Sequence, residues 1–157
     1  MSLKDDKTVD LFARPGFLVR RLHQIYVAIY LQECEAFGTT PVQTSIMQVA
    51  RFNPGIDQAT LAAEIGVDRT TTSNVLTRLE GRGFVRREND ARDKRLRRVF
   101  LEAAGETLLA EIRGALDRAH GRLVDPLEPE EREAFTQTLQ RLVEANNLHG
   151  RTSLRIL

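Results

Sequence analysis

The chain is poor in the side chains that build metal sites and covalent cross-links. Cys34 is the single cysteine among 157 residues, so neither an internal disulfide nor a multi-cysteine zinc site can form. The three histidines, His23, His120 and His149, lack the His-x-x-His or Glu-x-x-His spacing of a metal-binding helix. The sequence therefore predicts no metal and no cofactor.

Long apolar runs and catalytic motifs are also missing. Charges interrupt every helical stretch, so no run approaches the roughly 18 apolar residues of a membrane span. Residues 1–10 contain Lys4, Asp5, Asp6 and Lys7 in place of the apolar stretch of a secretory signal. No phosphate-binding glycine loop and no nucleophile elbow is found. We therefore expect a cytoplasmic protein that has no membrane partner and is not an enzyme.

Positive charge is concentrated in the middle of the chain. The whole sequence has a net charge of +1. Between Asp68 and Arg98, ten basic residues stand against five acidic ones, so this segment has a net charge of +5 and the remainder −4. A basic segment between acidic ends is typical of a surface that binds nucleic acid. The alternative is a charged face that is only solvated.

Both ends of the chain have the periodicity of long helices. Apolar residues recur at spacings of three and four from about Pro15 to Gly38 and from about Ala103 to Val124. The apolar face of the first helix is wider than docking on one neighbour needs, which indicates burial against a second chain. A last helix is expected after Glu128-Pro129, with a buried stripe formed by Phe135, Leu139 and Leu142.

The segment between these helices has the pattern of a helix–turn–helix. Asp57 and Asp68 each precede a short helical stretch as N-caps, and Gly66 lies where a left-handed turn is needed. The second helix must present a polar, hydrogen-bonding face to the major groove of DNA. Arginine can read guanine, asparagine can read adenine, and hydroxyls reach bases or phosphates. The predicted DNA-contacting residues of this helix are Arg69, Thr70, Thr71, Ser73, Asn74, Thr77 and Arg78.

Two short strands are predicted after this helix, over residues 84–88 and 96–101, joined by a polar hairpin tip. Such a hairpin is a wing, and its basic side chains Arg92, Lys94 and Arg95 are predicted to contact phosphates or a narrow minor groove. Asp90 and Asp93 have a structural interpretation, because they can pair with nearby arginines and keep the tip rigid.

With these motifs the chain resembles the MarR family of bacterial regulators. The resemblance depends on the helix pair TLAAEIGVDRTTTSNVLTRLEGRGFV (60–85), on the wing RRENDARDKRLRRVFL (86–101) with its Asp-x-Arg-Asp-x-Arg pattern, and on the helices at both sides. One departure is visible. Family members commonly have Leu-Thr-x-x-Gly after the second wing strand, whereas this chain has Glu102 in place of the threonine N-cap. Glutamate is still favourable at a helix N-terminus.

The resemblance implies a mainly α fold with a small β-wing. A single chain (1–157) would contain a winged helix–turn–helix lobe (40–101) and a helical dimerisation region (15–38 and 103–157). It would act as a homodimer on a pseudo-palindromic site in double-stranded DNA, in the bacterial cytoplasm and at the nucleoid when bound. Most such proteins are repressors that release DNA when a small aromatic or anionic molecule binds.

The first helix is also similar to members that sense aromatic acids or their thioesters. A site for a carboxylate needs cationic and polar side chains beside apolar ones. The candidate effector-binding residues are Phe17, Arg20, His23, Gln24, Val27 and Met47. The alternative is that the polar members of this set form ion pairs at the dimer interface.

Two other functions remain as alternatives. Some relatives sense oxidants through one reactive thiol, but Cys34 lies near a helix C-terminus between Glu33 and Glu35, where a thiolate is disfavoured. A non-specific architectural DNA-binding protein would share the basic wing but would bind every duplex with comparable affinity.

Overall fold

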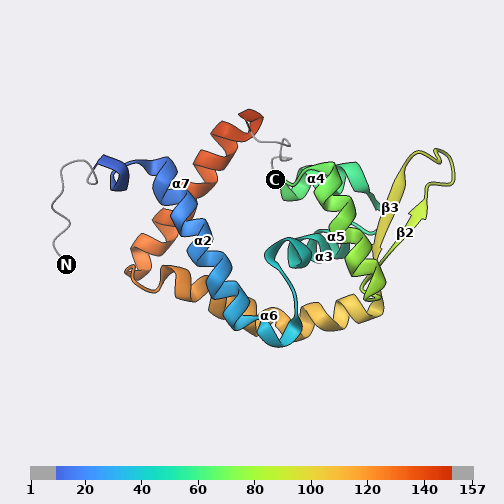
Figure 1. The fold of residues 1–157 in the computed structure, drawn as a ribbon, viewed down its shortest axis with the longest axis horizontal. Coiled ribbons are helices and arrows are strands. Elements are labelled where there is room, and N and C mark those ends of the chain that lie inside the picture. Colours follow the sequence, from blue (N-terminus) through green and yellow to red (C-terminus); the bar gives the residue numbers. More distant parts are fainter. Residues whose placement is uncertain (1–9, 150–157) are drawn as a thin grey trace.

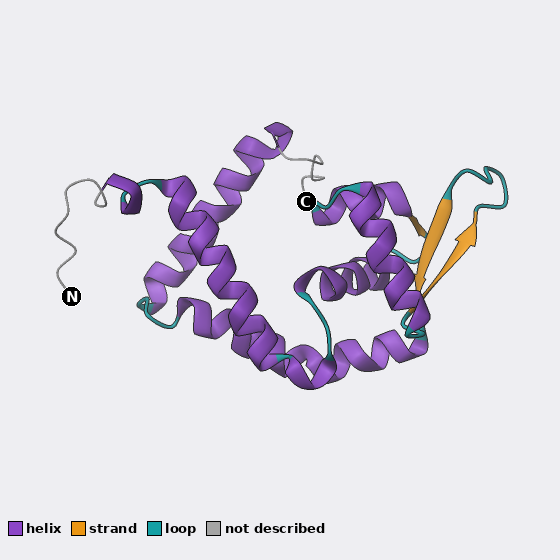
Figure 2. Cartoon of the chain, viewed as in Figure 1, coloured by secondary structure: helices purple, strands orange, loops and turns teal. Residues whose placement is uncertain are grey.

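The computed structural model describes residues 10–149 and confirms a mainly helical fold with a small antiparallel sheet. The short helices and the sheet gather at one end, α2 and α7 lie at the other, and α6 joins the two ends (Figure 1). All strands lie at the end that holds the short helices, which is the winged lobe (Figure 2). No helix among residues 10–149 is long and apolar enough to cross a membrane. The elements are α2 (Pro15–Glu33), η1 (Glu35–Phe37), α3 (Pro41–Phe52), β1 (Ile56–Asp57), α4 (Gln58–Ile65), α5 (Arg69–Gly81), β2 (Val85–Asn89), β3 (Arg97–Leu101), α6 (Ala103–Val124), α7 (Pro129–Asn146) and η2 (Asn147–His149).

The helix boundaries follow the capping residues of the sequence. The side chains of Asp57 and Asp68 accept hydrogen bonds from the backbone N–H groups of Thr60 and Thr71, at 2.9 Å and 2.8 Å. Each bond satisfies a donor that the first helical turn leaves free. Gly66 ends α4 with a φ of 69°, a conformation that favours glycine. The predicted N-caps and the turn of the helix–turn–helix are therefore confirmed.

The sheet has one strand more than the sequence predicts. Its order is β1-β3-β2, and both pairs are antiparallel. The two wing strands are confirmed, each beginning one residue later than predicted. β1 has only two residues, Ile56 and Asp57, and pairs with Val99 and Arg98 of β3. A two-residue strand is too short to show the alternation that identifies strands in a sequence.

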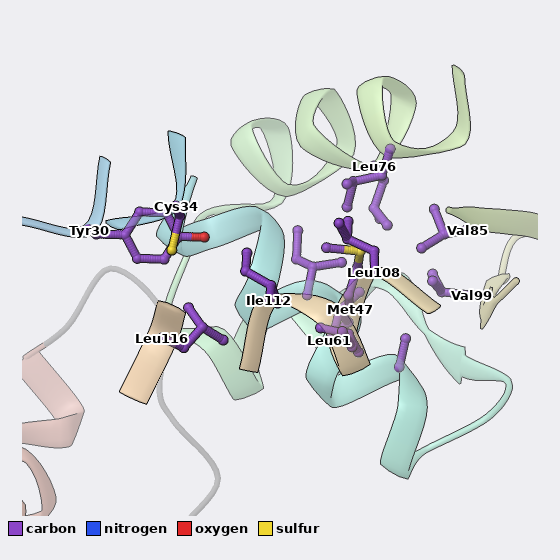
Figure 3. Packing of buried hydrophobic residues seen from close by; sticks show 14 of the residues in the cluster. Tyr30, Cys34, Met47, Leu61, Leu76, Val85, Val99, Leu108, Ile112 and Leu116 are labelled. Atoms are coloured by element: carbon purple, nitrogen blue, oxygen red, sulfur yellow. The ribbon is translucent and has the colours of Figure 1, made fainter. Parts of the chain in front are cut away.

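The hydrophobic core lies inside the winged lobe and is closed by α6. α3 contributes Ile46 and Met47, while α6 contributes a buried face that runs from Leu108 through Ile112 to Leu116. These side chains meet those of α4, α5 and the sheet in a single cluster (Figure 3). Tyr30 of α2 is also fully buried at the edge of this core. One part of α6 packs in the core and another part packs on α2. The packing of α6 therefore fixes the position of the lobe relative to α2.

The first turn of α6 packs very closely on the lobe. Glu102 is its N-cap but makes no side-chain capping bond, as expected from the missing threonine, and instead pairs with Arg86 at 2.8 Å. A Cβ atom on Gly105 would lie 2.4 Å from the backbone oxygen of Phe84 and 2.5 Å from Leu101 Cδ1. Only glycine permits this approach of helix to strand.

The helices outside the lobe leave much apolar surface uncovered. Leu18, Val19 and Ile25 of α2 are each about half exposed. The predicted buried stripe of α7 is wrong for the single chain, because Phe135 and Leu139 are only half-buried and Leu142 is exposed. The physical reason is that α7 projects away from the lobe and finds no broad surface of its own chain to pack on (Figure 1).

We expect Gly105→Ala to destabilise the protein by about 1–3 kcal/mol, because the added methyl group meets a backbone oxygen that cannot easily move. Gly114 lies in the exposed interior of the same helix and has room for a Cβ, so Gly114→Ala should stabilise by about 0.5–1 kcal/mol. Urea unfolding of both variants measures the difference. Equal effects of the two substitutions would contradict the close contact at Gly105.

Candidate nucleic-acid interface

The second helix of the helix–turn–helix, α5, presents a polar face to solvent. Leu76, Leu79 and Thr72 are fully buried and fix the rotation of the helix on the core. The opposite face carries the residues that the sequence predicts as DNA contacts. Ser73 is half-buried, and the exposed members are Arg69, Thr70, Thr71, Asn74, Thr77 and Arg78.

The structure separates these seven residues into two groups. Thr71 Oγ1 donates to the Asp68 carboxylate at 2.8 Å, and Thr77 Oγ1 donates to the backbone oxygen of Ser73 at 3.0 Å. These two hydroxyls therefore contribute to the local structure of α5. Within residues 10–149, the side chains of the others make no hydrogen bond to the protein, and so they can bond to a ligand; they are Arg69, Thr70, Ser73, Asn74 and Arg78.

Arg87 connects α5 to the sheet, a role that the sequence analysis missed. Its side chain is 9% exposed, and its Nε and Nη2 atoms donate to Glu80 Oε2 at 3.0 Å and 2.8 Å. Nη2 also donates to Thr77 Oγ1 at 3.0 Å. The hydrogen bonds from Arg87 keep the pKa of Glu80 below its usual value. The alternation of β2, with Val85 buried, is the signal that would have pointed Arg87 inward.

The wing loop is organised around Asp90, whose predicted pairing with a nearby arginine is confirmed. Asp90 Oδ1 accepts the backbone N–H groups of Arg92 and Asp93, both at 2.8 Å, and Oδ2 accepts Arg98 Nε. Arg98 Nη1 also donates to the backbone oxygen of Gly55 at 2.8 Å, so Arg98 links the wing to the segment before β1. The Asp93 amide, the Arg98 guanidinium and the Arg92 amide together lower the pKa of Asp90 to about 2.

The basic side chains of the tip project from this fixed backbone. Arg92 and Lys94 are exposed and make no side-chain hydrogen bond within the described part of the chain. The Arg95 side chain is 90% exposed even though its Nε donates to Asp93 at 3.0 Å. The tip therefore offers cations on a fixed scaffold, which is what contact with phosphates or a narrow groove needs.

A second arginine that the sequence analysis missed lies at the other end of α5. Arg82 donates from Nη1 to the backbone oxygen of Gly38 at 2.7 Å and from Nη2 to that of Phe37 at 3.0 Å. Its guanidinium also lies 4.6 Å from the ring centroid of Phe84. The end of the recognition helix is thereby bonded to the loop that follows α2.

The candidate effector-binding residues do not form one cluster. Met47 is fully buried in the core, while Arg20, His23 and Gln24 lie on the exposed surface of α2. Phe17 and Val27 are half-buried, and the Arg20 guanidinium stands 5.5 Å from the Phe17 ring centroid. A separate hollow of about 520 Å³ lies between α3 and α6. Its lining includes Arg51, Phe52, Leu109, Arg113, Leu116 and His120.

Cys34 and the acidic side chains give little support to redox or metal chemistry. Cys34 is 1% exposed, and burial, together with the nearby Glu33, raises the pKa of its thiol. A raised pKa disfavours the thiolate that oxidants attack. Among residues 10–149 no group of three or more His, Cys, Asp or Glu side chains is placed to bind a metal ion.

We expect the Asp90 carboxylate to control the order of the wing. At neutral pH, Asp90→Asn should accelerate amide hydrogen exchange at residues 92 and 93, because the charge that pairs with Arg98 is lost. In the wild type the carboxylate is the form that makes these bonds, so their contribution is present above the ordinary pKa of 3.8 and is lost as the pH falls through about 2.

Glu88→Gln is the matched control, because Glu88 pairs with Arg86 at the surface of the same hairpin without touching the tip. Amide exchange followed by NMR or mass spectrometry distinguishes the variants. Unchanged exchange in Asp90→Asn would mean that the backbone of the tip is held by something else.

Comparisons with known proteins agree with this geometry. A family model described as "MarR family" matches residues 39–96, which span the lobe from the start of α3 to the wing. The transcriptional regulator HosA of Escherichia coli O157:H7 is 34% identical over 125 residues, which cover 80% of this chain and 91% of HosA.

Solved structures of similar shape include DNA-bound and ligand-regulated proteins. The transcriptional repressor CouR, bound to a 23-mer DNA duplex, superposes with a TM-score of 0.81 at 25% identity, covering 91% of this chain and 99% of CouR. Bordetella bronchiseptica BpsR, whose DNA binding is regulated by 6-hydroxynicotinic acid, superposes with a TM-score of 0.78 at 25% identity, covering 83% of this chain and 93% of BpsR. The chain belongs to the MarR family of transcriptional regulators and is a DNA-binding protein rather than an enzyme.

Proposed function

We propose that the protein is a homodimeric repressor that binds a pseudo-palindromic operator and releases it when a small aromatic or anionic ligand binds. The observation that carries this proposal is the exposed polar face of α5 beside a basic wing whose backbone is bonded to Asp90. The recognition helix would enter the major groove, and the wing tip would reach the adjacent minor groove. The place of action would be the bacterial cytoplasm, at the nucleoid.

The uncovered apolar surface of α2 and α7 supports a dimer. Most of the exposed large apolar side chains of the described residues lie on these two helices; they are Leu18, Val19, Ile25 and Leu31 of α2 and Leu142 and Val143 of α7. Exposed apolar side chains that gather on one part of a protein typically mark a protein interface. A second copy of the chain would cover it and would set two recognition helices side by side, as a two-fold operator requires.

Within each lobe, two kinds of DNA contact are proposed. Asn74 and Arg78 can bond to base edges, because amide and guanidinium groups make bidentate pairs with adenine and guanine. Thr70 and Ser73 add hydroxyls beside them. At the wing, Arg92, Lys94 and Arg95 would neutralise backbone phosphates or enter the minor groove, which adds affinity without reading sequence directly.

The two kinds of contact respond differently to substitution. Arg92→Ala should weaken binding to every duplex and lower the slope of log K against log salt by about one. Asn74→Ala should lower the preference for the operator by about tenfold and leave the salt slope nearly unchanged. Fluorescence anisotropy with DNA from the gene's own upstream region and a scrambled duplex, at two salt concentrations, measures both quantities.

The same titrations test the alternatives. A specific regulator should prefer its own site by about a thousandfold or more, whereas an architectural protein binds both duplexes alike. If Arg92→Ala leaves affinity and salt slope untouched, the assignment of the wing is wrong. Loss of operator binding on mild oxidation, reversed by a reductant and absent in Cys34→Ala, would favour the redox-sensing alternative.

The proposed ligand is an anionic aromatic molecule that binds in the hollow between α3 and α6. Arg51, Arg113 and His120 supply polar and cationic groups beside one carboxylate, that of Asp117. The apolar surface comes from Phe52, Leu109 and Leu116. Arg51 is paired with Glu106 at 3.1 Å, whereas Arg113 makes no side-chain hydrogen bond within the described residues. Arg113 is therefore the proposed partner of a ligand carboxylate. A contribution from the α2 residues Phe17, Arg20, His23, Gln24 and Val27 stays a prediction.

We expect a panel of aromatic acids to contain a compound that releases the protein from its operator. Arg113→Ala should raise the half-maximal concentration of that compound at least tenfold, because the charge-assisted bond to the carboxylate is lost. Arg20→Ala, on the exposed face of α2, separates the two candidate sites in the same assay. A larger effect of Arg20→Ala than of Arg113→Ala would place the ligand against α2 instead.

A further inference from the structure

A hollow lies where the starts of α4 and α5 meet the wing just before β3. It has a volume of about 260 Å³. Its lining consists of Asp57, Gln58 and Ala59 at the start of α4, of Arg69 at the start of α5, and of Arg95, Leu96 and Arg97 in the wing. We call it the α5–wing hollow. Arg97 was not among the DNA-binding residues that the sequence predicts.

The direction of the Arg97 side chain follows from the sheet. Successive residues of a strand point to opposite faces, so Arg97 shares a face with Val99 and not with Arg98. Val99 is fully buried against the core, and Arg87, its partner across the ladder, points to α5. Arg97 therefore stands on the side of β3 that faces α5, beyond the last core residue, while Arg98 on the other side serves Asp90.

The charge balance of the hollow is positive. The carboxylate of Asp57 is occupied in capping α4, where it accepts the N–H and the hydroxyl of Thr60. Glu80 lies near Arg97 but is bonded to Arg87 through both carboxylate oxygens. Arg69 and Arg97 make no side-chain hydrogen bond within residues 10–149. Two free guanidinium groups thus border one small hollow, and a tetrahedral oxyanion matches guanidinium forks well.

The position of the hollow indicates which oxyanion it meets. Each sugar–phosphate strand of a duplex separates the major groove from the minor groove. A protein that inserts α5 into one groove and the wing tip into the next must let one strand pass between them. The α5–wing hollow lies in that passage. We infer that it binds a phosphate of the DNA strand that crosses between α5 and the wing, with Arg97 and Arg69 as its ligands.

This inference rests on the proposed binding mode. It adds Arg97 as a residue that would fix the position of the protein along the duplex without contacting bases. Arg97→Ala should lower the affinity for upstream and scrambled duplexes by a similar factor, about tenfold, and reduce the salt slope by about one. Arg97→Lys keeps the charge and should keep the slope. Arg86→Ala is the matched control, because it removes an arginine from the opposite face of the same sheet, where Arg86 pairs with Glu88 and Glu102, and it should keep the affinity and slope of the wild type.

The outcomes separate the inference from the function on which it depends. If the wild type shows no salt-dependent DNA binding, the proposed function fails. If the wild type binds and Arg97→Ala keeps the full affinity and slope, only the phosphate site is refuted. A selective loss of operator preference at unchanged slope would also overturn it, because Arg97 would then be reading bases.

A free anion is the other source of the same chemistry. Inorganic phosphate, titrated into the protein without DNA at constant ionic strength, should produce no saturable shift in the NMR amide signals of residues 69 and 97. A saturable shift in the wild type that disappears in Arg97→Ala would assign the hollow to a free anion and contradict the DNA phosphate site.

Discussion

The packing of α6 against the lobe is the constraint on which the rest of the molecule depends. One face of this helix, from Leu108 to Leu116, completes the core of the lobe, and Gly105 lets its first turn approach the backbone of Phe84. Its second half runs along α2, where the ring of His120 stacks on Tyr26 with the centroids 5.3 Å apart. Glu33 of α2 accepts bonds from Arg118 and Arg122 of α6, each at 2.9 Å. The lobe and the outer helices are therefore joined by one continuous element, so a displacement at either end is carried along a helix rather than through a flexible linker.

The side that we propose to face DNA is built on a second set of polar contacts. Arg87 bonds the middle of α5 to the sheet through Glu80 and Thr77, Arg98 bonds the wing to Gly55 through Asp90, and Arg82 bonds the end of α5 to Phe37 and Gly38. Each of these arginine side chains forms hydrogen bonds to other residues of the chain. Other basic side chains in the same region, among them Arg69, Arg92 and Arg97, make no such bond within the described residues. The basic segment thus combines structural arginines with arginines that are available to DNA, a division that net charge does not reveal.

Regulation by a ligand fits the same construction. The hollow between α3 and α6 touches the helix that joins the lobe to α2, so a bound molecule would act where the two parts meet. A ligand shifts such an equilibrium only by its difference in affinity between the two arrangements. The energy for releasing DNA would have to come from contacts that exist in one position of α6 and not in the other. Arg113 is placed for such a contact, because it lies on α6 itself.

Local structure and family membership could both be predicted from the order of the residues alone. The N-caps Asp57 and Asp68, the left-handed Gly66 and the helical periodicity act within a few residues, so the starts of α4 and α5, the end of α4 and the bounds of α6 follow from them almost without error. The wing sequence also predicted the role of Asp90, because its bonds to the amides of residues 92 and 93 are local. Other features depend on contacts between segments far apart in the chain. β1 exists because β3 pairs with it, and Arg82, Arg87 and Arg97 acquire their roles from partners or hollows formed by distant segments. The stripe on α7 shows the same limit, since periodicity marks an apolar face but does not say whether the chain itself, or a second copy, supplies the surface that covers it.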